Sequence, residues 1–298
     1  MALKDLLSSS LPNYCVNLLS GKNICFRPMI VSEEKSLLLA KQNEDKQSII
    51  KNLINVLSNC CSDESLKNIK NISITDFENL FLSVRGKSIG EIETFTVKCP
   101  ETQEQVQIKI NLEKDVQLSP STANNVIKLN DNLVLVMKEP SVYSLFKYPN
   151  YDKNNEQLFG FIGSCMKELQ TNKESINCEE MPEQEVIDFI KNLTKKQFND
   201  ITTYLSNISK IYILANYKTK DDTERQLKIS GIFNYFNFFF DHLNLKLYYR
   251  QNFLLKNYHN YTLYEIENMI PWERSVYIEQ LRVYLKEKEQ KNKGFELL

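Results

Sequence analysis

The stretch EIETFTVKCPETQEQVQIKINL, residues 91–112, decides the fold class of this chain. On both sides of a turn at residues 99–103, apolar side chains largely alternate with polar ones, which is the side-chain period of a β-strand. Two strands joined by so short a turn run antiparallel, because a parallel pair needs a crossover connection of about a dozen residues or more. The stretch therefore predicts a β-hairpin.

Similar pairs of strand-like segments occur three more times, at residues 14–19 and 22–27, 126–129 and 133–137, and 211–217 and 225–229. Between and after the hairpins, the apolar residues follow a helical period. The helices that we expect cover residues 32–40, 45–60, 75–84, 154–210 with a polar loop at 172–182, 231–240, 245–257, 262–269 and 271–290. The sequence thus predicts an α+β fold in which helices pack with several separate antiparallel β-hairpins, followed by a helical C-terminal region.

The order of these segments suggests two regions. Residues 1–140 are expected to form an N-terminal α+β region with three hairpins, and residues 141–298 a mainly helical C-terminal region with one hairpin. Pro140 marks the division, because it ends the third hairpin and Ser141 is placed to cap a short helix.

The composition excludes several classes of function. The chain has 37 Lys plus Arg and 38 Asp plus Glu, for a net charge of -1, so no excess of positive charge favours nucleic acid as a partner. It has seven glycines and two histidines in 298 residues. Phosphate-binding loops consume glycine, and histidine is the commonest catalytic base and transition-metal ligand, so we expect no nucleotide cofactor and no chemistry built on several histidines.

The cysteines and the apolar runs bear on the cellular compartment. The seven cysteines are odd in number and scattered, and MALKDLLSSS at the start lacks the long apolar core of a signal peptide, so we expect reduced thiols in a cytosol. The longest apolar run, residues 232–240, is interrupted by two asparagines and is too short to span a membrane.

Two short motifs resemble ligand sites but are incomplete. Gly86-Lys87-Ser88 resembles the end of a phosphate-binding loop, yet a helix is expected before it and Phe81 stands where the loop needs glycine. We interpret Gly86 and Gly90 as structural turn residues between helix and hairpin. Cys99-Pro100 resembles half of a zinc knuckle, but the second thiolate is missing, so we expect no metal. Because no G-x-S-x-G elbow occurs and the paired carboxylates lie in polar surroundings, we predict no catalytic residue.

The best candidates for a functional surface lie in the C-terminal half. The helix at residues 232–240 carries apolar residues on nearly every side, which is typical of a core helix, but an exposed aromatic patch would mark an interface. Trp272, the only tryptophan, either anchors a partner or packs into the core at a helix start. The candidate interface residues are Phe233, Phe236, Phe239, Trp272 and Arg274.

Segments spread over most of the chain resemble one known family, the baseplate hub subunit and hub assembly proteins of T-even-like contractile-tailed phages. The central match is the most specific, with Leu80-Phe81-Leu82 followed by the run from Arg85 to Glu91. The matching segments are Phe26-Arg27-Pro28, Glu33-Glu34-Lys35, Leu37-Leu38-Leu39-Ala40, Leu80-Phe81-Leu82, Arg85-Gly86-Lys87-Ser88-Ile89-Gly90-Glu91, Val97-Lys98-Cys99-Pro100, Ile108-Lys109-Ile110-Asn111-Leu112 and Met269-Ile270-Pro271-Trp272-Glu273-Arg274. Many members of that family carry a second cysteine in the hairpin tip, where this chain has Cys99-Pro100-Glu101-Thr102.

The resemblance implies a non-enzymatic protein of the virion tail that works through contacts with other phage baseplate or tail proteins. It implies a place in the host cytoplasm during assembly and in the tail baseplate of the virion, and it brings no catalytic residue or cofactor. Two alternatives stay open at this point. One is a cytosolic tail-assembly chaperone that is absent from the mature virion, and the other is an enzyme whose site the sequence does not reveal.

Overall fold

The computed structural model describes residues 11–61 and 69–295. The α-helices are α2 (Val31–Gln42), α3 (Lys46–Cys60), α4 (Ile74–Ile89), α5 (Val142–Lys147), α6 (Asn155–Ser164), α7 (Glu183–Lys191), α8 (Lys195–Asn207), α9 (Ile232–Phe240), α10 (Leu245–His259), α11 (Leu263–Asn268) and α12 (Pro271–Phe295). The short 3-10 helices are η2 (Ile69–Asn71) and η3 (Cys178–Glu180). The strands are β1 (Tyr14–Asn17), β2 (Asn23–Phe26), β3 (Ile92–Lys98), β4 (Gln105–Asn111), β5 (Val116–Ser119), β6 (Val126–Asn130), β7 (Leu133–Met137), β8 (Met166–Thr171), β9 (Ser175–Asn177), β10 (Lys210–Lys218) and β11 (Glu224–Ser230).

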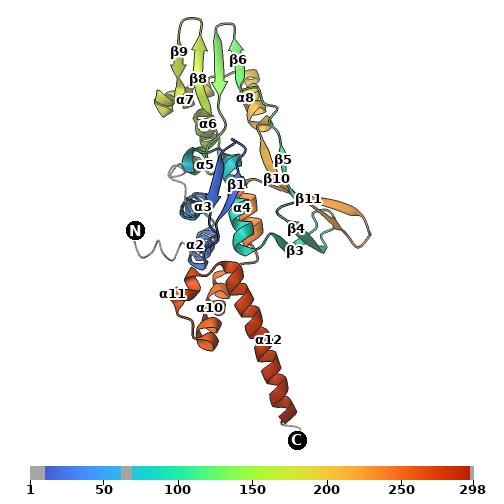
Figure 1. Cartoon of the computed structure of the whole chain (residues 1–298). Helices are drawn as coiled ribbons and strands as arrows, with labels where there is room; N and C mark the ends of the chain where they lie inside the picture. The colour runs from blue at the N-terminus through green and yellow to red at the C-terminus, as the bar shows by residue number, and fades with distance from the viewer. Residues whose placement is uncertain (1–10, 62–68, 296–298) are drawn as a thin grey trace.

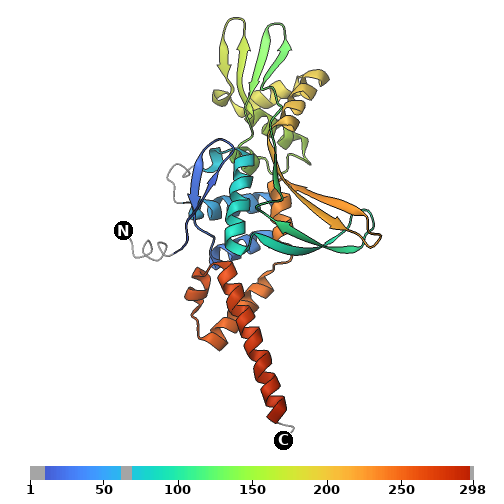
Figure 2. The ribbon, with the colours of Figure 1, turned by 45° about the vertical axis from the view of Figure 1, so that its right-hand side comes forward.

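The molecule is elongated (Figures 1 and 2). Strands β6 to β9 and helices α6 to α8 lie at one end, α2 to α5 and the other hairpins lie in the middle, and α12 projects away from the body at the other end. Among the described residues the strands form four small antiparallel sheets. The predicted α+β class with separate hairpins and a helical C-terminal region is confirmed.

All four predicted hairpins form. Strands β3 and β4 pair from Ile92 opposite Asn111 to Lys98 opposite Gln105, as the alternation in residues 91–112 predicts. The pair β10 and β11 acquires a third strand, β5, which was not predicted. The physical reason is that β5 has only four residues, and its burial pattern shows no buried face.

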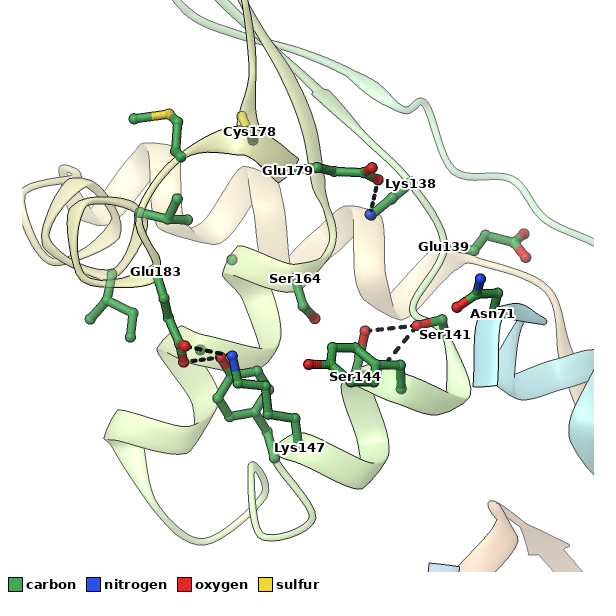
Figure 3. A pocket seen from close by; sticks show the side chains of 17 residues that line it. Asn71, Lys138, Glu139, Ser141, Ser144, Lys147, Ser164, Cys178, Glu179 and Glu183 are labelled. Atoms are coloured by element: carbon green, nitrogen blue, oxygen red, sulfur yellow. Dashed lines mark hydrogen bonds and ion pairs between the residues drawn. The ribbon is translucent and has the colours of Figure 1, made fainter. Parts of the chain in front are cut away.

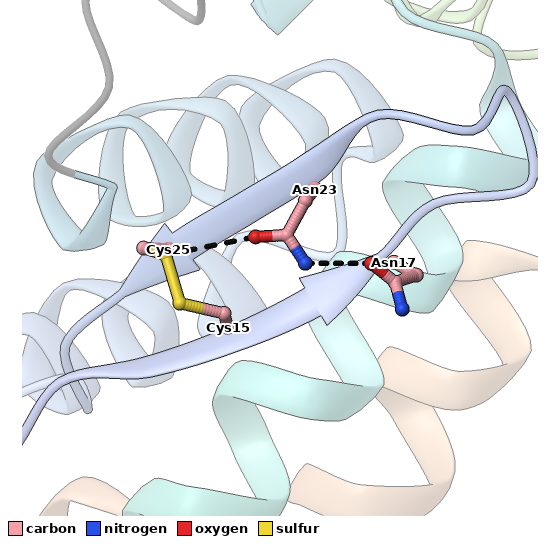
Figure 4. The surroundings of a disulfide bond; sticks show 4 residues. All are labelled: Cys15, Asn17, Asn23 and Cys25. Carbon is pink, nitrogen blue, oxygen red and sulfur yellow. Dashed lines mark hydrogen bonds between the residues drawn. A yellow bond between two sulfur atoms is a disulfide. The ribbon is translucent and has the colours of Figure 1, made fainter.

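The first hairpin corrects the expectation that every cysteine is a reduced thiol. Cys15 and Cys25 are directly opposed in the β1–β2 register and are joined by a disulfide (Figure 4). The neighbouring pair, Asn17 and Asn23, is joined by a side-chain hydrogen bond of 2.6 Å. The buried cysteines 60, 99, 165 and 178 are free thiols.

A second correction concerns the segment 154–210, which was expected to be helical apart from a polar loop. Residues 166–171 and 175–177 are the strands β8 and β9, which extend the third hairpin to a four-stranded sheet of order β6-β7-β8-β9. The pairing of β7 with β8 shifts between Val136 and Met137, where a bulge is inserted. The buried residues Met166 and Leu169 are therefore three apart, a spacing typical of a helix rather than of a strand.

Gly86 and Gly90 occupy different positions relative to helix α4. Helix α4 continues to Ile89, five residues beyond the predicted end, so Gly86 lies inside the helix. Gly90 follows the helix at its C-cap position and has φ 155°, where the chain passes from α4 into β3. The buried guanidinium of Arg85 donates to the Gly90 carbonyl at 3.0 Å and pairs with Glu93, so it ties this helix end to the hairpin.

The buried apolar residues form two clusters. The first cluster draws on residues 18–110, on Val142 and Leu145 in α5, and on residues 211–278. The second cluster is built from one continuous segment, residues 127–204. The β6–β7 hairpin therefore packs with helices that follow residue 140, and this division of the core differs from the expected separation at that position.

Candidate interaction surface

Helix α9 is a core helix rather than an exposed patch. Phe236 and Phe239 are fully buried, so these two interface candidates are corrected. The Phe236 ring stacks on Phe240 at a centroid distance of 5.0 Å, and Arg85 lies 4.3 Å from the centre of the Phe239 ring. A helix that is apolar on nearly every side needs neighbours on every side, and α2 and β11 pack against it. Phe233 is half-buried, with the Lys46 ammonium 5.1 Å from its ring centre.

The two interface candidates at the start of α12, Arg274 and Trp272, differ in burial. Arg274 is 4% exposed, and its Nη2 donates to a carboxylate oxygen of Glu34 at 2.7 Å, so Arg274 is a buried ion-pair partner and not a surface residue. Burial raises the pKa of Glu34, and the Arg274 charge opposes that rise. Trp272 is 41% exposed and stays a candidate for contact with a partner.

Most exposed apolar side chains lie near Trp272 in the chain. Of the sixteen large hydrophobic residues that are exposed in the described part of the chain, ten lie between residues 249 and 284. They are Tyr249, Phe253, Tyr258, Leu263, Tyr264, Trp272, Val276, Tyr277, Val283 and Tyr284. We call these ten residues the C-terminal patch. All ten belong to helices α10 to α12, which lie at the end of the molecule where α12 projects (Figure 1).

Sequence reasoning missed nine of the ten residues, although a signal was present. In α12 the buried residues Arg274, Ile278 and Leu281 form one stripe, while Trp272, Val276 and Val283 form another. An amphipathic surface helix needs only one apolar stripe. The second stripe predicts a second neighbour, and the same reasoning applies to Tyr249 and Phe253 in α10.

Polar contacts hold the C-terminal helices against α2. The Val31 amide donates to the Met269 carbonyl at 2.9 Å, Lys35 pairs with Glu267 at 3.2 Å, and Arg274 pairs with Glu34. Tyr248, which is buried, lies beneath the guanidinium of Arg274 at 5.2 Å. These contacts anchor α11 and the first turn of α12 to α2.

A polar cavity of about 570 Å³ lies beside α5, α6 and α7, and Figure 3 shows its lining. Its two lysines already have partners, because Lys138 pairs with Glu179 and Lys147 pairs with Glu183. Tyr148 also donates to Glu183. No histidine is among the lining residues. Glu139 also lines the cavity, and burial raises its pKa. The ion pairs of Lys138 and Lys147 favour a structural role for that part of the wall over acid–base catalysis.

The hairpin tip at Cys99 is tied to its neighbour hairpin. The Cys99 thiol is buried and lies 3.3 Å from the Tyr217 hydroxyl in β10. Hydrogen bonds, chiefly from Thr102, lower the pKa of Cys99 to about 7. Within residues 11–61 and 69–295, no three His, Cys, Asp or Glu side chains are grouped as a metal site, and the absence of metal stays a prediction. None of the helices described is both long and apolar enough to cross a bilayer.

The chain matches a known protein family over most of its length. The family model described as T4 bacteriophage base plate protein matches residues 11–237. The matched residues include all four predicted hairpins and end within α9, so the C-terminal patch lies outside them. No curated protein matches the chain, and no solved structure matches it.

Proposed function

The chain belongs to the T4 bacteriophage base plate protein family, and on this premise we propose that it is a structural subunit or an assembly factor of the baseplate hub. It acts through contacts with other baseplate or tail proteins, without an enzymatic site. The run from Arg85 to Glu91 and the Cys99-Pro100 tip support the hub in particular, because they carry the resemblance to hub proteins.

The observation that carries the contact role is the C-terminal patch. Aromatic side chains are enriched at protein interfaces, and tryptophan and tyrosine dominate their energetics. Six of the ten patch residues are tyrosine or tryptophan, at positions 249, 258, 264, 272, 277 and 284, and each is at least 40% exposed. We infer that a tail protein covers α10 and α12 in the assembled baseplate.

The second candidate is a cytosolic tail-assembly chaperone that is absent from the mature virion. The same patch would serve it, since a chaperone also binds tail proteins through apolar contacts. Because a subunit stays in the particle and a chaperone leaves it, the two candidates differ in where the protein is found. An enzyme with an unrecognised site is the third candidate, and the ion pairs that hold both lysines of the polar cavity speak against a catalytic role for those lysines.

Quantitative mass spectrometry of purified particles separates the first two candidates. A low and fixed number of copies per particle supports a hub subunit. Absence from particles, with the protein abundant in infected lysate, supports an assembly factor. Deletion of the gene with complete and infective baseplates would contradict both.

A further inference from the structure

A second cleft, of about 730 Å³, lies where the two apolar clusters meet. Helices α4 and α9 contribute one side, with Glu78 and Phe233, and these elements belong to the first cluster. The other side includes Leu158, Phe161 and Leu205 from the second cluster. Apolar side chains from both halves of the core therefore line the cleft, together with a similar number of polar and charged residues.

Glu78 is the unusual residue of this cleft. Its side chain is 6% exposed, and it accepts a hydrogen bond from the Ile232 amide at the start of α9. A carboxylate has about four acceptor positions, so one amide leaves most of them unused. In the part of the chain that the structure describes, no lysine, arginine or histidine pairs with Glu78.

The other charged groups of the cleft do not compensate Glu78. Lys46 pairs with Asp152 at 2.8 Å, and Lys210 donates to the Ser206 carbonyl at 2.7 Å. Lys153 is also a lining residue. The phenols of Tyr151 and Tyr235 lie within electrostatic range of Glu78, and the Tyr235 hydroxyl donates to the Ile211 carbonyl. Burial raises the pKa of Glu78 to about 8, so the carboxyl is largely protonated at neutral pH.

We propose that this cleft receives a lysine or arginine side chain of another baseplate protein, whose cationic head pairs with Glu78 and whose aliphatic stem packs on the apolar residues of the lining. We propose a cationic partner because a buried carboxylate is stable in its ionised form only when it is paired and hydrogen-bonded. A long cationic side chain fits such a place, since its stem is apolar and its head is charged. The identity of the partner rests on the proposed function.

A structural role of Glu78 as a cap of helix α9 would explain its bond to the Ile232 amide but not its unused acceptor positions. Helix α9 follows Gly231, which offers no side-chain cap, and the Glu78 carboxyl accepts from the first amide of the helix instead. Glutamine at position 78 would keep that bond through its amide oxygen but cannot form an ion pair. The variant Glu78→Gln therefore separates the capping role from the cation-binding role.

The test uses the full chain and butylguanidinium as the probe, with carbon-13 NMR of the Glu78 carboxyl at pH 7. We expect the probe to ionise the carboxyl, with at least a tenfold rise in its ionisation constant, while neutral 1-pentanol causes no such change. The Glu78 signal is assigned by its loss in Glu78→Gln. No response to the cation, or an equal response to pentanol, overturns the proposal.

Incorporation into particles tests the partner separately. The control is Glu139→Gln, because Glu139 is another carboxyl with a raised pKa, but it is exposed and lines the polar cavity instead of this cleft. We expect Glu78→Gln to reduce the copies per particle at least several-fold relative to that control. If the cation binds but incorporation is unchanged, the assignment to a baseplate partner is wrong. If neither variant protein nor wild type enters particles, the subunit role fails while the NMR result for the cleft stands.

Discussion

Replacing Gly86 or Gly90 by alanine tests whether the junction between helix α4 and the β3–β4 hairpin requires glycine. Gly90 holds φ 155°, which side chains with a Cβ rarely adopt, so Gly90→Ala should destabilise the protein by about 1 kcal/mol or more. At Gly86, inside α4, an added Cβ would lie 3.4 Å from Leu112 Cδ1, a contact that a small shift of that side chain relieves. Gly86→Ala should therefore be neutral, or stabilising by up to about 1 kcal/mol. Urea denaturation measures both, and equal losses would contradict the assignment.

The burial of Glu78 predicts how stability depends on pH. Its folded-state pKa of about 8 lies above the usual value, so the folded state binds the proton more tightly than the unfolded state. This contribution is present below about pH 4.5 and is lost as the pH rises through 8, by at most about 5 kcal/mol. Glu78→Gln removes the dependence, so the variant should gain in melting temperature relative to wild type between pH 5 and pH 8.5. A constant difference across that range would show that Glu78 ionises normally.

The sequence does not predict the contacts and the burial of every residue equally well. The turn predicted at residues 20 and 21 would place Cys15 opposite Phe26, whereas in the structure the register differs by one residue and Cys15 faces Cys25, so their disulfide was not predicted. The burial of Glu78 and Arg274 could not be predicted either, because the carboxyl and the guanidinium are buried by elements more than 150 residues away in the chain, α9 and α2 respectively. Charged residues are exposed by default, and only tertiary contacts override that default.

At the scale of elements, the period of apolar residues and the spacing of turns predict the pairing of strands that are close in the chain. They do not predict the pairing of strands that are far apart in the chain. The four predicted hairpins form because each pair is joined by a short turn. Strand β5 pairs with β10 across about ninety residues, and β8 was misread because its bulge gives a helical spacing. Helix α12 begins at Pro271, as predicted, since the missing amide costs nothing at a first helical position.

At the start of α12, truncation of the buried Arg274 should destabilise the protein more than truncation of the half-exposed Trp272. Arg274→Ala leaves the buried carboxylate of Glu34 without its partner and should cost about 3 to 5 kcal/mol of stability. Trp272→Ala removes a side chain that is 41% exposed and should cost only about 1 to 2 kcal/mol. Thermal melting and chemical denaturation of both variants check this order.

The same pair of variants tests the C-terminal patch. At a temperature where both variants are folded, Trp272→Ala should reduce incorporation into baseplates more than Arg274→Ala does, because tryptophan is a preferred interface anchor. Incorporation that simply follows the loss of stability would remove Trp272 from the interface.

At the scale of the whole molecule, the two apolar clusters differ in how the chain builds them. The second cluster is local, within residues 127–204, whereas the first joins segments from the beginning, the middle and the end of the described chain. Where the chain passes from Met137 of the second cluster to Val142 of the first, the Ile74 amide donates to the Pro140 carbonyl at 3.0 Å. Sequence periodicity finds apolar faces but does not show which faces meet, so this division was not predicted.

We expect the two clusters to unfold as separate cooperative units. Ile162→Ala opens a cavity in the second cluster, where Ile162 is fully buried, and Ile50→Ala does the same in the first. Each should cost about 2 to 5 kcal/mol within its own cluster. Hydrogen exchange followed by mass spectrometry should show faster exchange over residues 126–204 for Ile162→Ala, with α3 and α4 unchanged, and the reverse for Ile50→Ala. Faster exchange throughout both clusters in either variant would mean a single unit. In that case the cleft at Glu78 would be a rigid seam, and a partner side chain bound there would add to the stability of the whole chain instead of coupling two parts that open separately.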